Sequence, residues 1–579
     1  MRRTILFSCF FGILLLGSCS DETSIFIDEQ RQSIVEENYP VALSASVSFD
    51  NAGVIDITID QNYSGKRVSK AMEEPAGNYP MTMIGQVKPP TFGPITSLTA
   101  AHVYVEDNFA YVAYNTAGED YAGAIDIIDV RDPNDPQVTS RLVYTNADIN
   151  SLQYHEGFLY AVGGLDATAS FTASSNSFIT KIPVFNGVMD SDAGVIYGFQ
   201  QGDNATDIVI DKNEAYVTSG KAGSVVVYET EDLVVKEEQA FMDLRSLALF
   251  ENRLAVLDAD LGIRVLDNNL NPKMEIPIDS DFGLYTKRTV DFDGEKIIVA
   301  EGNKGAGVYS YETGTLIQHI PILIDPEQPP LGDVVNNAVG INGDMVLMAN
   351  GGAGLSVSND EGDTAQPYGV IQLGGSINYV QTRGDYAFAA SGQEGLQIIK
   401  LNRLSLSLAA QCATLPEYDG SSKLVINQGE NVGFSGAKSF NSIRVEGALL
   451  LCGSWTVIND VDVKDDAIME MNGSLSVGSN KKQKEIKVEK GATLRIEGNL
   501  TIYGDLDLAD DSFLEFIGEQ SVVNIFGDVK LGFFLGLFLG YQSWGVLVVG
   551  SFLSFLLGGV VSILLLALRI KGRKDAIPF

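Results

Sequence analysis

The chain has 579 residues, with 75 Asp and Glu against 39 Lys and Arg, so its formal net charge is −36. This length exceeds what one hydrophobic core usually organises, and we expect about two to four domains. A polyanionic body repels phosphate backbones, which excludes nucleic acid as an expected partner and favours cations or basic proteins. The excess of acidic residues lies in the part of the chain before Lys530, because only one acidic residue follows it.

The first 19 residues predict an export signal. Arginines at positions 2 and 3 precede an apolar run over residues 5–16, which is too short to span a membrane comfortably. The LGSC sequence at residues 16–19 resembles the lipobox of bacterial lipoproteins, which implies that Cys19 becomes the acylated N-terminus of the mature protein. We therefore expect a lipoprotein of the bacterial cell envelope, at the outer membrane or cell surface. An ordinary signal peptide with an incidental cysteine is the alternative.

Cysteine and histidine are scarce. Of four cysteines, only Cys412 and Cys452 lie outside the export signal and the lipidation site. They can form one disulfide in an exported protein, but their spacing leaves two free thiols open. The chain has only three histidines, His102, His155 and His319, and no Cys-x-x-Cys, so we expect neither a metal site nor a cofactor. We interpret His102 and His155 as structural residues.

Residues 20–94 are polar. They contain one alternating stretch, GVIDITID at residues 53–60, and a proline-rich stretch at residues 88–94. Alternation of apolar and polar residues predicts a strand, and proline interrupts it. We predict a tether with an N-terminal strand segment.

A unit recurs over residues 95–409. Each copy has a polar turn, a short apolar strand, a glycine-bearing turn and a second, alternating strand that begins at a glycine. That glycine falls at Gly123, Gly223, Gly262, Gly307, Gly354 and Gly395. The last four intervals are 39, 45, 47 and 41 residues, and the first leaves room for one more unit. Repeats of this length with period-two strands predict a seven-bladed β-propeller.

One unit carries a family resemblance. The sequence GAIDIIDVRDPNDPQVTSRL at residues 123–142 resembles the repeat of LVIVD-repeat β-propellers. The resemblance implies that the DP-containing turn joins the third and fourth strands of a blade. We interpret Asp129, Asp132 and Asp135 as turn residues that cap their own backbone, with calcium ligands as the alternative. The expected ligand of the propeller is an unidentified protein or glycan.

Residues 410–530 have a different pattern. Short apolar-x-apolar pairs recur, and glycine, asparagine or aspartate separates many of them. Each pair predicts one short strand, and inward residues that stack on the next pair give a β-solenoid or β-helix. A β-sandwich is the alternative. In either case the module is a stalk or spacer.

The C-terminal part is apolar. From Leu531 to Leu568 no residue carries a charge, which predicts an α-helical transmembrane segment, either two spans or one span with a re-entrant piece. Together with Cys19, this segment predicts attachment to a membrane.

A second resemblance lies at this junction. Residues 527–579, which begin GDVKLGFFLG, resemble the C-terminal part of prepilin type IV leader peptidases, which are intramembrane aspartic endopeptidases. The resemblance implies that Asp528 is one of two catalytic aspartates. The leading glycine of the family motif is absent and the first aspartate has no counterpart, so we expect this fragment to be inactive alone. GDVKL also repeats the form of GNLTI at 498–502 and GDLDL at 504–508, which indicates a third solenoid rung and a chimeric junction.

Three functions stay open. The favoured one is a non-enzymatic cell-envelope lipoprotein with a propeller that binds or scaffolds, because it rests on most of the chain. The second is an aspartic prepilin peptidase with an extracytoplasmic extension. The third is an adhesin-like structural surface protein. Enzymatic activity is therefore an open question at this level.

Overall fold

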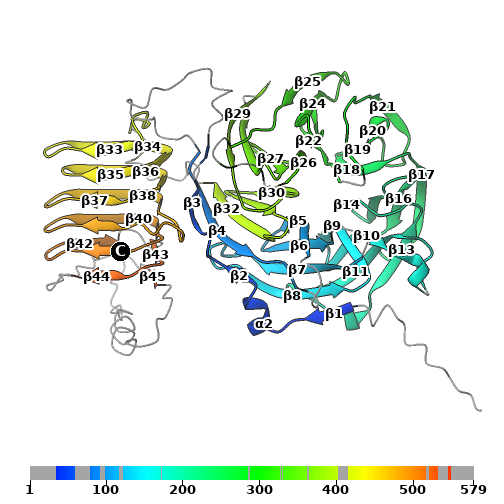
Figure 1. The fold of residues 1–579 in the computed structure, drawn as a ribbon, viewed down its shortest axis with the longest axis horizontal. Helices are drawn as coiled ribbons and strands as arrows, with labels where there is room; N and C mark the ends of the chain where they lie inside the picture. The colour runs from blue at the N-terminus through cyan, green and yellow to red at the C-terminus, as the bar shows by residue number, and fades with distance from the viewer. Residues whose placement is uncertain are drawn as a thin grey trace, which may run out of the picture.

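The computed structural model describes residues 34–55, 57–58, 79–91, 98–116, 121–170, 172–284, 287–325, 328, 330, 332–343, 345–360, 364–401, 412, 415–516, 521–531 and 546–549. These residues form two β domains that lie side by side, a propeller and a solenoid (Figure 1). The residues of the predicted export signal, Cys19 and most of the apolar C-terminal segment lie outside the described residues.

The propeller has seven antiparallel sheets, as predicted. Blade 1 contains β5 (Thr99–Glu106), β6 (Phe109–Asn115), β7 (Gly123–Asp129) and β8 (Gln137–Tyr144). Blade 2 contains β9 (Ala147–His155), β10 (Phe158–Leu165), β11 (Ser177–Phe185) and β13 (Ile196–Gln200), with the short β12 (Val188–Met189). Blade 3 contains β14 (Asp207–Asp211), β15 (Glu214–Thr218), β16 (Ser224–Glu229) and β17 (Val235–Ala240).

The other four blades follow the same order. Blade 4 contains β18 (Leu244–Phe250), β19 (Arg253–Asp258), β20 (Gly262–Leu266) and β21 (Pro272–Ile276), and blade 5 contains β22 (Val290–Asp293), β23 (Lys296–Ala300), β24 (Ala306–Ser310) and β25 (Leu316–Ile320). Blade 6 contains β26 (Val334–Asn342), β27 (Met345–Gly351), β28 (Leu355–Asp360) and β29 (Ala365–Ile371). Blade 7 contains β30 (Tyr379–Arg383), β31 (Tyr386–Ala390), β32 (Leu396–Leu401) and an outermost strand from elsewhere in the chain.

That outermost strand closes the ring. It is β4 (Met81–Val87), which pairs antiparallel with β32. The short strands β2 (Val47–Ser48) and β3 (Gly53–Ile55) pair with β4, and β1 (Ile34–Glu37) adds a fifth strand to blade 1 next to α2 (Pro40–Ser44). The N-terminal segment before residue 95 thus completes the propeller, and pairing its first part with its last part in one sheet removes an exposed strand edge.

The repeated glycines have a steric cause. Gly354 and Gly395 have φ angles of +88° and +77°, which side chains rarely adopt. A Cβ atom would lie 2.3 Å from the Ile371 carbonyl oxygen at Gly354 and 2.0 Å from that of Val87 at Gly395. Both carbonyls belong to the fourth strand of the same blade. The repeated glycine therefore marks the start of the third strand, where its backbone lies close to the fourth strand.

The second domain is a solenoid of parallel strands. Its first sheet contains β33 (Lys423–Ile426), β35 (Ser442–Val445), β37 (Val461–Val463), β39 (Ile486–Val488), β41 (Leu506–Leu508) and β44 (Val529–Leu531). Its second sheet contains β34 (Asn431–Phe440), β36 (Ala448–Val457), β38 (Ile468–Val477), β40 (Thr493–Ile502), β42 (Phe513–Phe516), β43 (Val522–Ile525) and β45 (Val546–Val549).

All these strands pair parallel and in register, which a β-sandwich of antiparallel hairpins does not allow. Buried apolar residues stack from rung to rung in the first sheet, in the order Leu424, Ile443, Val461, Ile486 and Leu506. The solenoid alternative is therefore the one observed.

The GDVKL sequence is one more rung. Its Val529–Leu531 part is β44, which pairs with β41 of the GDLDL sequence. GNLTI ends β40 in the second sheet, so only GDLDL and GDVKL stack directly on each other.

The predicted transmembrane helix is not supported by the described residues. Apart from Leu531 in β44, only Val546–Val549 of the apolar segment are described, and they form strand β45, which pairs with β43. No helix in the described part of the chain is both long and apolar enough to span a membrane. The transmembrane segment therefore stays a prediction for residues outside this description.

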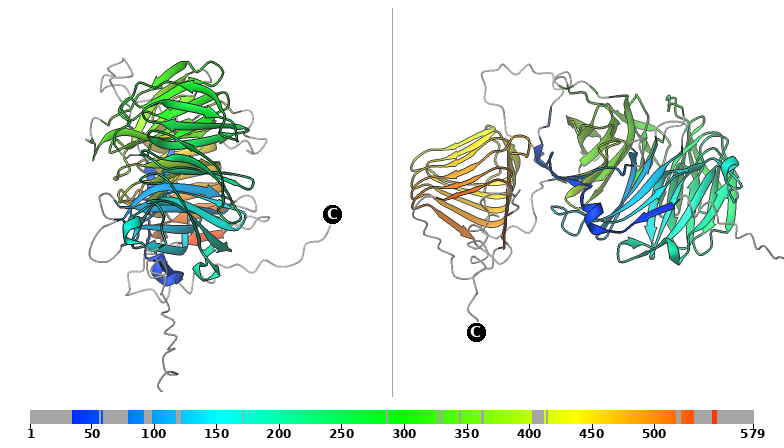
Figure 2. Two further views of the ribbon diagram at one scale, coloured as in Figure 1. Left: turned by 90° about the vertical axis from the view of Figure 1, so that its right-hand side faces the viewer. Right: turned by 60° about the horizontal axis from the view of Figure 1, so that its bottom comes forward.

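Backbone hydrogen bonds join the two domains. The Val54 N–H donates to the Gly478 carbonyl over 2.7 Å, and the Asn480 N–H donates to the Ala52 carbonyl over 2.6 Å. The buried Tyr503 hydroxyl donates to the Met83 carbonyl of β4 over 3.2 Å. The right-hand view of Figure 2 shows part of the dark blue N-terminal segment, labelled β3 in Figure 1, between the solenoid and the ring. One N-terminal segment thus closes the propeller and holds the solenoid.

We predict that Gly53→Ala loosens this junction. A Cβ atom at Gly53 would lie 2.0 Å from the Ser479 Cα atom, so the solenoid must move away. The expected cost is about 1–3 kcal/mol of stability, as for other overpacked contacts. Solution X-ray scattering should report a larger radius of gyration.

The matched control is Gly194→Ala. Gly53 and Gly194 both have a positive φ, +140° and +108°, but nothing lies within 4 Å of the Cβ position at Gly194. Equal expansion in the two variants, or in neither, contradicts the prediction.

Candidate functional site

The inner edges of the seven sheets surround the propeller axis, and their backbone N–H groups need acceptors. Side chains of the preceding blade supply them. The Asp207 carboxylate accepts from Leu247 N over 3.4 Å, and the Ser246 hydroxyl accepts from Val290 N over 3.3 Å. The same relation recurs in three further pairs: Thr289 with Val339 N, Gln153 with Ile210 N, and Gln381 with Val105 N. At five of the seven junctions between blades, one blade thereby satisfies a backbone donor of the next.

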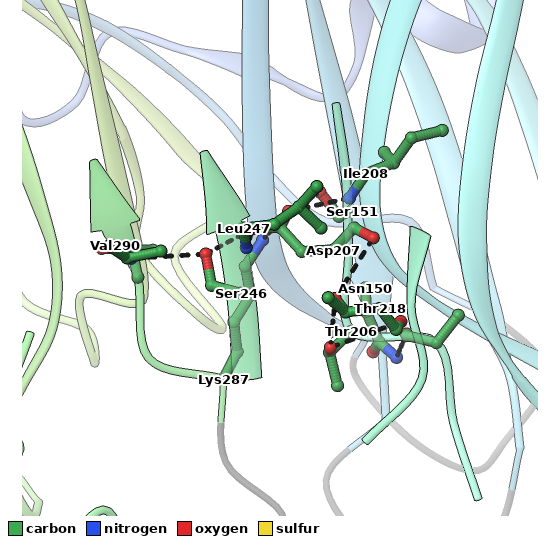
Figure 3. A network of polar contacts seen from close by, with 12 residues as sticks. Asn150, Ser151, Thr206, Asp207, Ile208, Thr218, Ser246, Leu247, Lys287 and Val290 are labelled. Carbon is green, nitrogen blue, oxygen red and sulfur yellow. Dashed lines mark hydrogen bonds and ion pairs between the residues drawn. The ribbon is translucent and has the colours of Figure 1, made fainter. Parts of the chain in front are cut away.

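Asp207 is the centre of this network (Figure 3). Its carboxylate accepts from the Ser151 hydroxyl of blade 2 over 2.7 Å and from the Ser246 hydroxyl of blade 4 over 2.6 Å. Lys287, just before blade 5, donates to the same carboxylate over 3.0 Å. One aspartate on blade 3 therefore joins four consecutive blades, and its acceptor capacity is used by the fold itself.

Lys287 also reaches across the axis. Its ammonium lies 5.2 Å from the ring centroid of Tyr379 on blade 7, and the Tyr379 ring lies 4.2 Å from that of His102 on blade 1. Burial lowers the pKa of Lys287, and Asp207 opposes that shift. Burial and then the charge of Lys287 place the pKa of His102 well below its usual value, so this imidazole is neutral at physiological pH. At the axis, Lys287 thus lies between its partner Asp207 and the Tyr379 ring, which in turn packs on His102.

Asp291 stands apart from these pairs. It lies on β22, where its side chain keeps access to solvent. The surrounding protein reduces its hydration and raises its pKa to about 6, with further contributions from the carboxylates of Asp207 and Asp293. Its carboxylate accepts a hydrogen bond from the neighbouring Phe292 N over 2.8 Å. The Asp291 side chain therefore changes from neutral to negatively charged as the pH rises through about 6.

The three aspartates of the first repeat unit are turn residues. Asp129 accepts from Arg131 N and Asp132 accepts from Asn134 N, both over 3.0 Å. Asp135 accepts from the Gln137 side chain over 2.8 Å. Within the described ranges, no group of three or more His, Cys, Asp or Glu is arranged to hold a metal ion.

Asp528 is exposed at a corner of the solenoid. Its N–H donates to the Asp505 carboxylate over 2.8 Å, and its carbonyl accepts from Leu506 N over 3.0 Å. Lys530 lies 2.6 Å from the same Asp505 carboxylate and lowers its pKa. The Asp505 carboxylate beside Asp528 is thus held ionised, whereas a catalytic aspartate pair shares a proton. The contacts of Asp528 with Asp505 and Leu506 are those of one solenoid rung stacked on the next.

The cysteines and the remaining histidines are placed as follows. Cys412 and Cys452 are joined by a disulfide that ties the start of the solenoid to β36. His319 lies 3.1 Å from the Glu301 carboxylate, and His155 lies at the end of β9. Cys19 lies outside the described residues.

A cavity of about 370 Å³ opens between blades 2 and 3. Blade 2 contributes His155, Phe158 and Lys181, and blade 3 contributes Glu229 and Glu231. Lys181 is only 9% exposed. Its ammonium donates to the carbonyls of Thr230 and Glu231 over 2.8 and 2.9 Å and lies 4.0 Å from the centroid of the Phe158 ring. Sequence reasoning missed this lysine, although it breaks the apolar pattern of its strand, ITKIPV.

We predict that Asp207→Asn destabilises the propeller by about 3–5 kcal/mol, because it leaves the buried Lys287 ammonium without its counterion. Urea unfolding, followed by far-ultraviolet circular dichroism, measures the change. The control is Asp260→Asn on the exposed turn after β19, which should stay within about 0.5 kcal/mol of the unchanged protein. A similar loss in both variants contradicts the central role of Asp207.

We also predict that Asp291→Asn removes a pH dependence. The folded-state pKa of about 6 is above the usual value for aspartate, so the folded state holds this proton more tightly than the unfolded state. Stability therefore falls as pH rises from about 4 to about 6. Thermal unfolding of Asp291→Asn should match the unchanged protein at pH 4 and exceed it at pH 8. A difference that is the same at both pH values refutes this.

Comparisons with known proteins identify only similar folds. No protein-family model and no curated protein sequence matches the chain. Among solved structures, the WD40 repeats of RRP9 share 14% identity over 56% of this chain and 99% of theirs, with a TM-score of 0.41. The WD40 propeller of Doa1 shares 12% over 55% and 97%, with a TM-score of 0.41, and the Neurospora crassa Pan2 WD40 domain shares 10% over 57% and 98%, with a TM-score of 0.42. The propeller assignment rests on the strand pairing described above.

Proposed function

We propose that this protein is a cell-envelope lipoprotein, acylated at Cys19, whose propeller binds a ligand while the solenoid acts as a rigid spacer. The observation that carries the proposal is the cavity between blades 2 and 3, which combines aromatic and charged side chains in a space of ligand size. In Figure 1 these blades lie on the side of the ring away from the solenoid. A ligand at this cavity therefore does not compete with the junction between the domains.

The packing of the molecule supports a binding function. The charged groups at the axis, Asp207 and Lys287, are used to hold the blades together. Backbone hydrogen bonds at residues 52–54 and 478–480 hold the solenoid to the ring. A rigid body of this kind presents a site at a fixed distance and orientation from its anchor.

The two alternatives differ in support. No observation favours the prepilin peptidase, because Asp528 lies on a solenoid rung beside an aspartate paired with Lys530. An adhesin-like surface protein would have the same architecture and differ only in its partner. Identifying the ligand of the cavity would distinguish an adhesin from a receptor for a soluble ligand.

The anchor is tested by Cys19→Ala. We expect the unchanged protein to incorporate an alkyne-labelled fatty acid in a bacterial host and to sediment with membranes, and the variant to lose the label. Cys9→Ala, inside the apolar run of the signal, is the control and should keep the label. Label retained in Cys19→Ala, or absent from the unchanged protein, overturns the assignment of a lipoprotein.

A further inference from the structure

The seven blades provide an internal comparison for Lys181. Hydrogen-bond register places Lys181 of β11 opposite Tyr160 of β10, and Tyr160 opposite Gln153 of β9. The same position on the third strand of the other blades is occupied by Ile127, Val227, Val265, Val308, Val357 and Ile398. All six are aliphatic and at most 6% exposed. Only blade 2 has a charged residue at this buried position.

A lysine here is costly for the fold. Removing an ammonium from water is unfavourable unless a counterion and hydrogen bonds replace the lost hydration. Lys181 has two carbonyl acceptors and the Phe158 ring, but no carboxylate of the described residues forms an ion pair with it. Desolvation accordingly lowers its pKa. Six blades pack with an aliphatic residue instead, so the fold does not require this cation.

The outer part of the cavity has the opposite charge. Glu156, Glu229 and Glu231 are exposed, whereas Lys181 is buried. Glu156 lies 4.0 Å from His155 Nε2, a buried nitrogen that has no hydrogen-bond partner. Lys236 is already paired with Glu214 over 2.6 Å. The cavity thus has one buried cation, Lys181, and around its entrance three carboxylates beside the Lys236–Glu214 pair.

We propose that this cavity binds a small zwitterion, with the ligand carboxylate at Lys181 and its cationic group at Glu156, Glu229 and Glu231. A simple anion would meet the three carboxylates, and a simple cation would meet the buried ammonium. A molecule with both charges matches the two regions, and such complementarity sets specificity. The cavity volume of about 370 Å³ suits a ligand of amino-acid size. This assignment rests on the proposed binding function of the propeller.

The first test is isothermal titration calorimetry of the purified full-length protein in detergent. The probes are glycine, 4-aminobutanoate and 6-aminohexanoate, which separate the two charges by increasing distances. Hexanoate and hexylamine each keep one charge. We expect at least one zwitterion to bind at least about tenfold more tightly than either single-charge analogue. Equal binding of hexylamine, or no zwitterion binding up to about 10 mM, overturns the proposal.

The second test uses Lys181→Val, which restores the residue type of the other blades. We expect zwitterion binding to be lost while the thermal unfolding temperature is unchanged or higher, because an aliphatic residue fits this position six times in the same ring. Lys273→Val on the exposed strand β21 is the control and should bind as the unchanged protein does. Unchanged binding in Lys181→Val overturns the proposal. Failure here leaves the fatty-acid labelling of Cys19 unaffected, so the two proposals fail separately.

Discussion

The structure depends on how the propeller satisfies the inner edges of its seven sheets. A strand edge at the axis presents backbone N–H groups that no further strand can pair with, because the sheets converge there. Side chains of one blade accept from the backbone of the next, and Asp207 does so while it also binds Ser151, Ser246 and Lys287. Blade-to-blade cohesion is therefore polar at the axis and apolar between the sheet faces.

The N-terminal segment performs two structural tasks with few residues. As β4 it is the fourth strand of blade 7, so the ring closes only after the first and last parts of the propeller meet. Through residues 52–54 and the Met83 carbonyl it also holds the solenoid. Closure of the ring and attachment of the second domain are thus coupled, and damage to one should weaken the other.

Buried charges divide into two kinds in this protein. The Asp207 and Lys287 pair has short contacts and a clear structural effect, since it links blades that are 80 residues apart in the chain. Lys181 has carbonyl and aromatic neighbours but no carboxylate of the described residues in ion-pair contact, at a position where the fold accepts valine or isoleucine. A buried charge that the architecture does not need is better evidence for a ligand than an exposed cluster, because exposed charges cost almost nothing.

Sequence patterns determined the two repeat architectures. Regular glycines predicted seven blades because each marks a close approach that admits no side chain, and at Gly262, Gly354 and Gly395 a positive φ as well. Apolar-x-apolar pairs predicted the rungs because inward residues must stack. Those causes act within one repeat. The parallel pairing that decided for a solenoid, the place of β4 in blade 7 and the contacts of Asp207 join residues far apart in the chain. The sequence shows that residue 181 is a lysine. Only the strand register of the seven sheets shows that the equivalent position is buried and aliphatic in the other six blades. Long-range packing decides which side chains lose water, and local pattern does not contain that information.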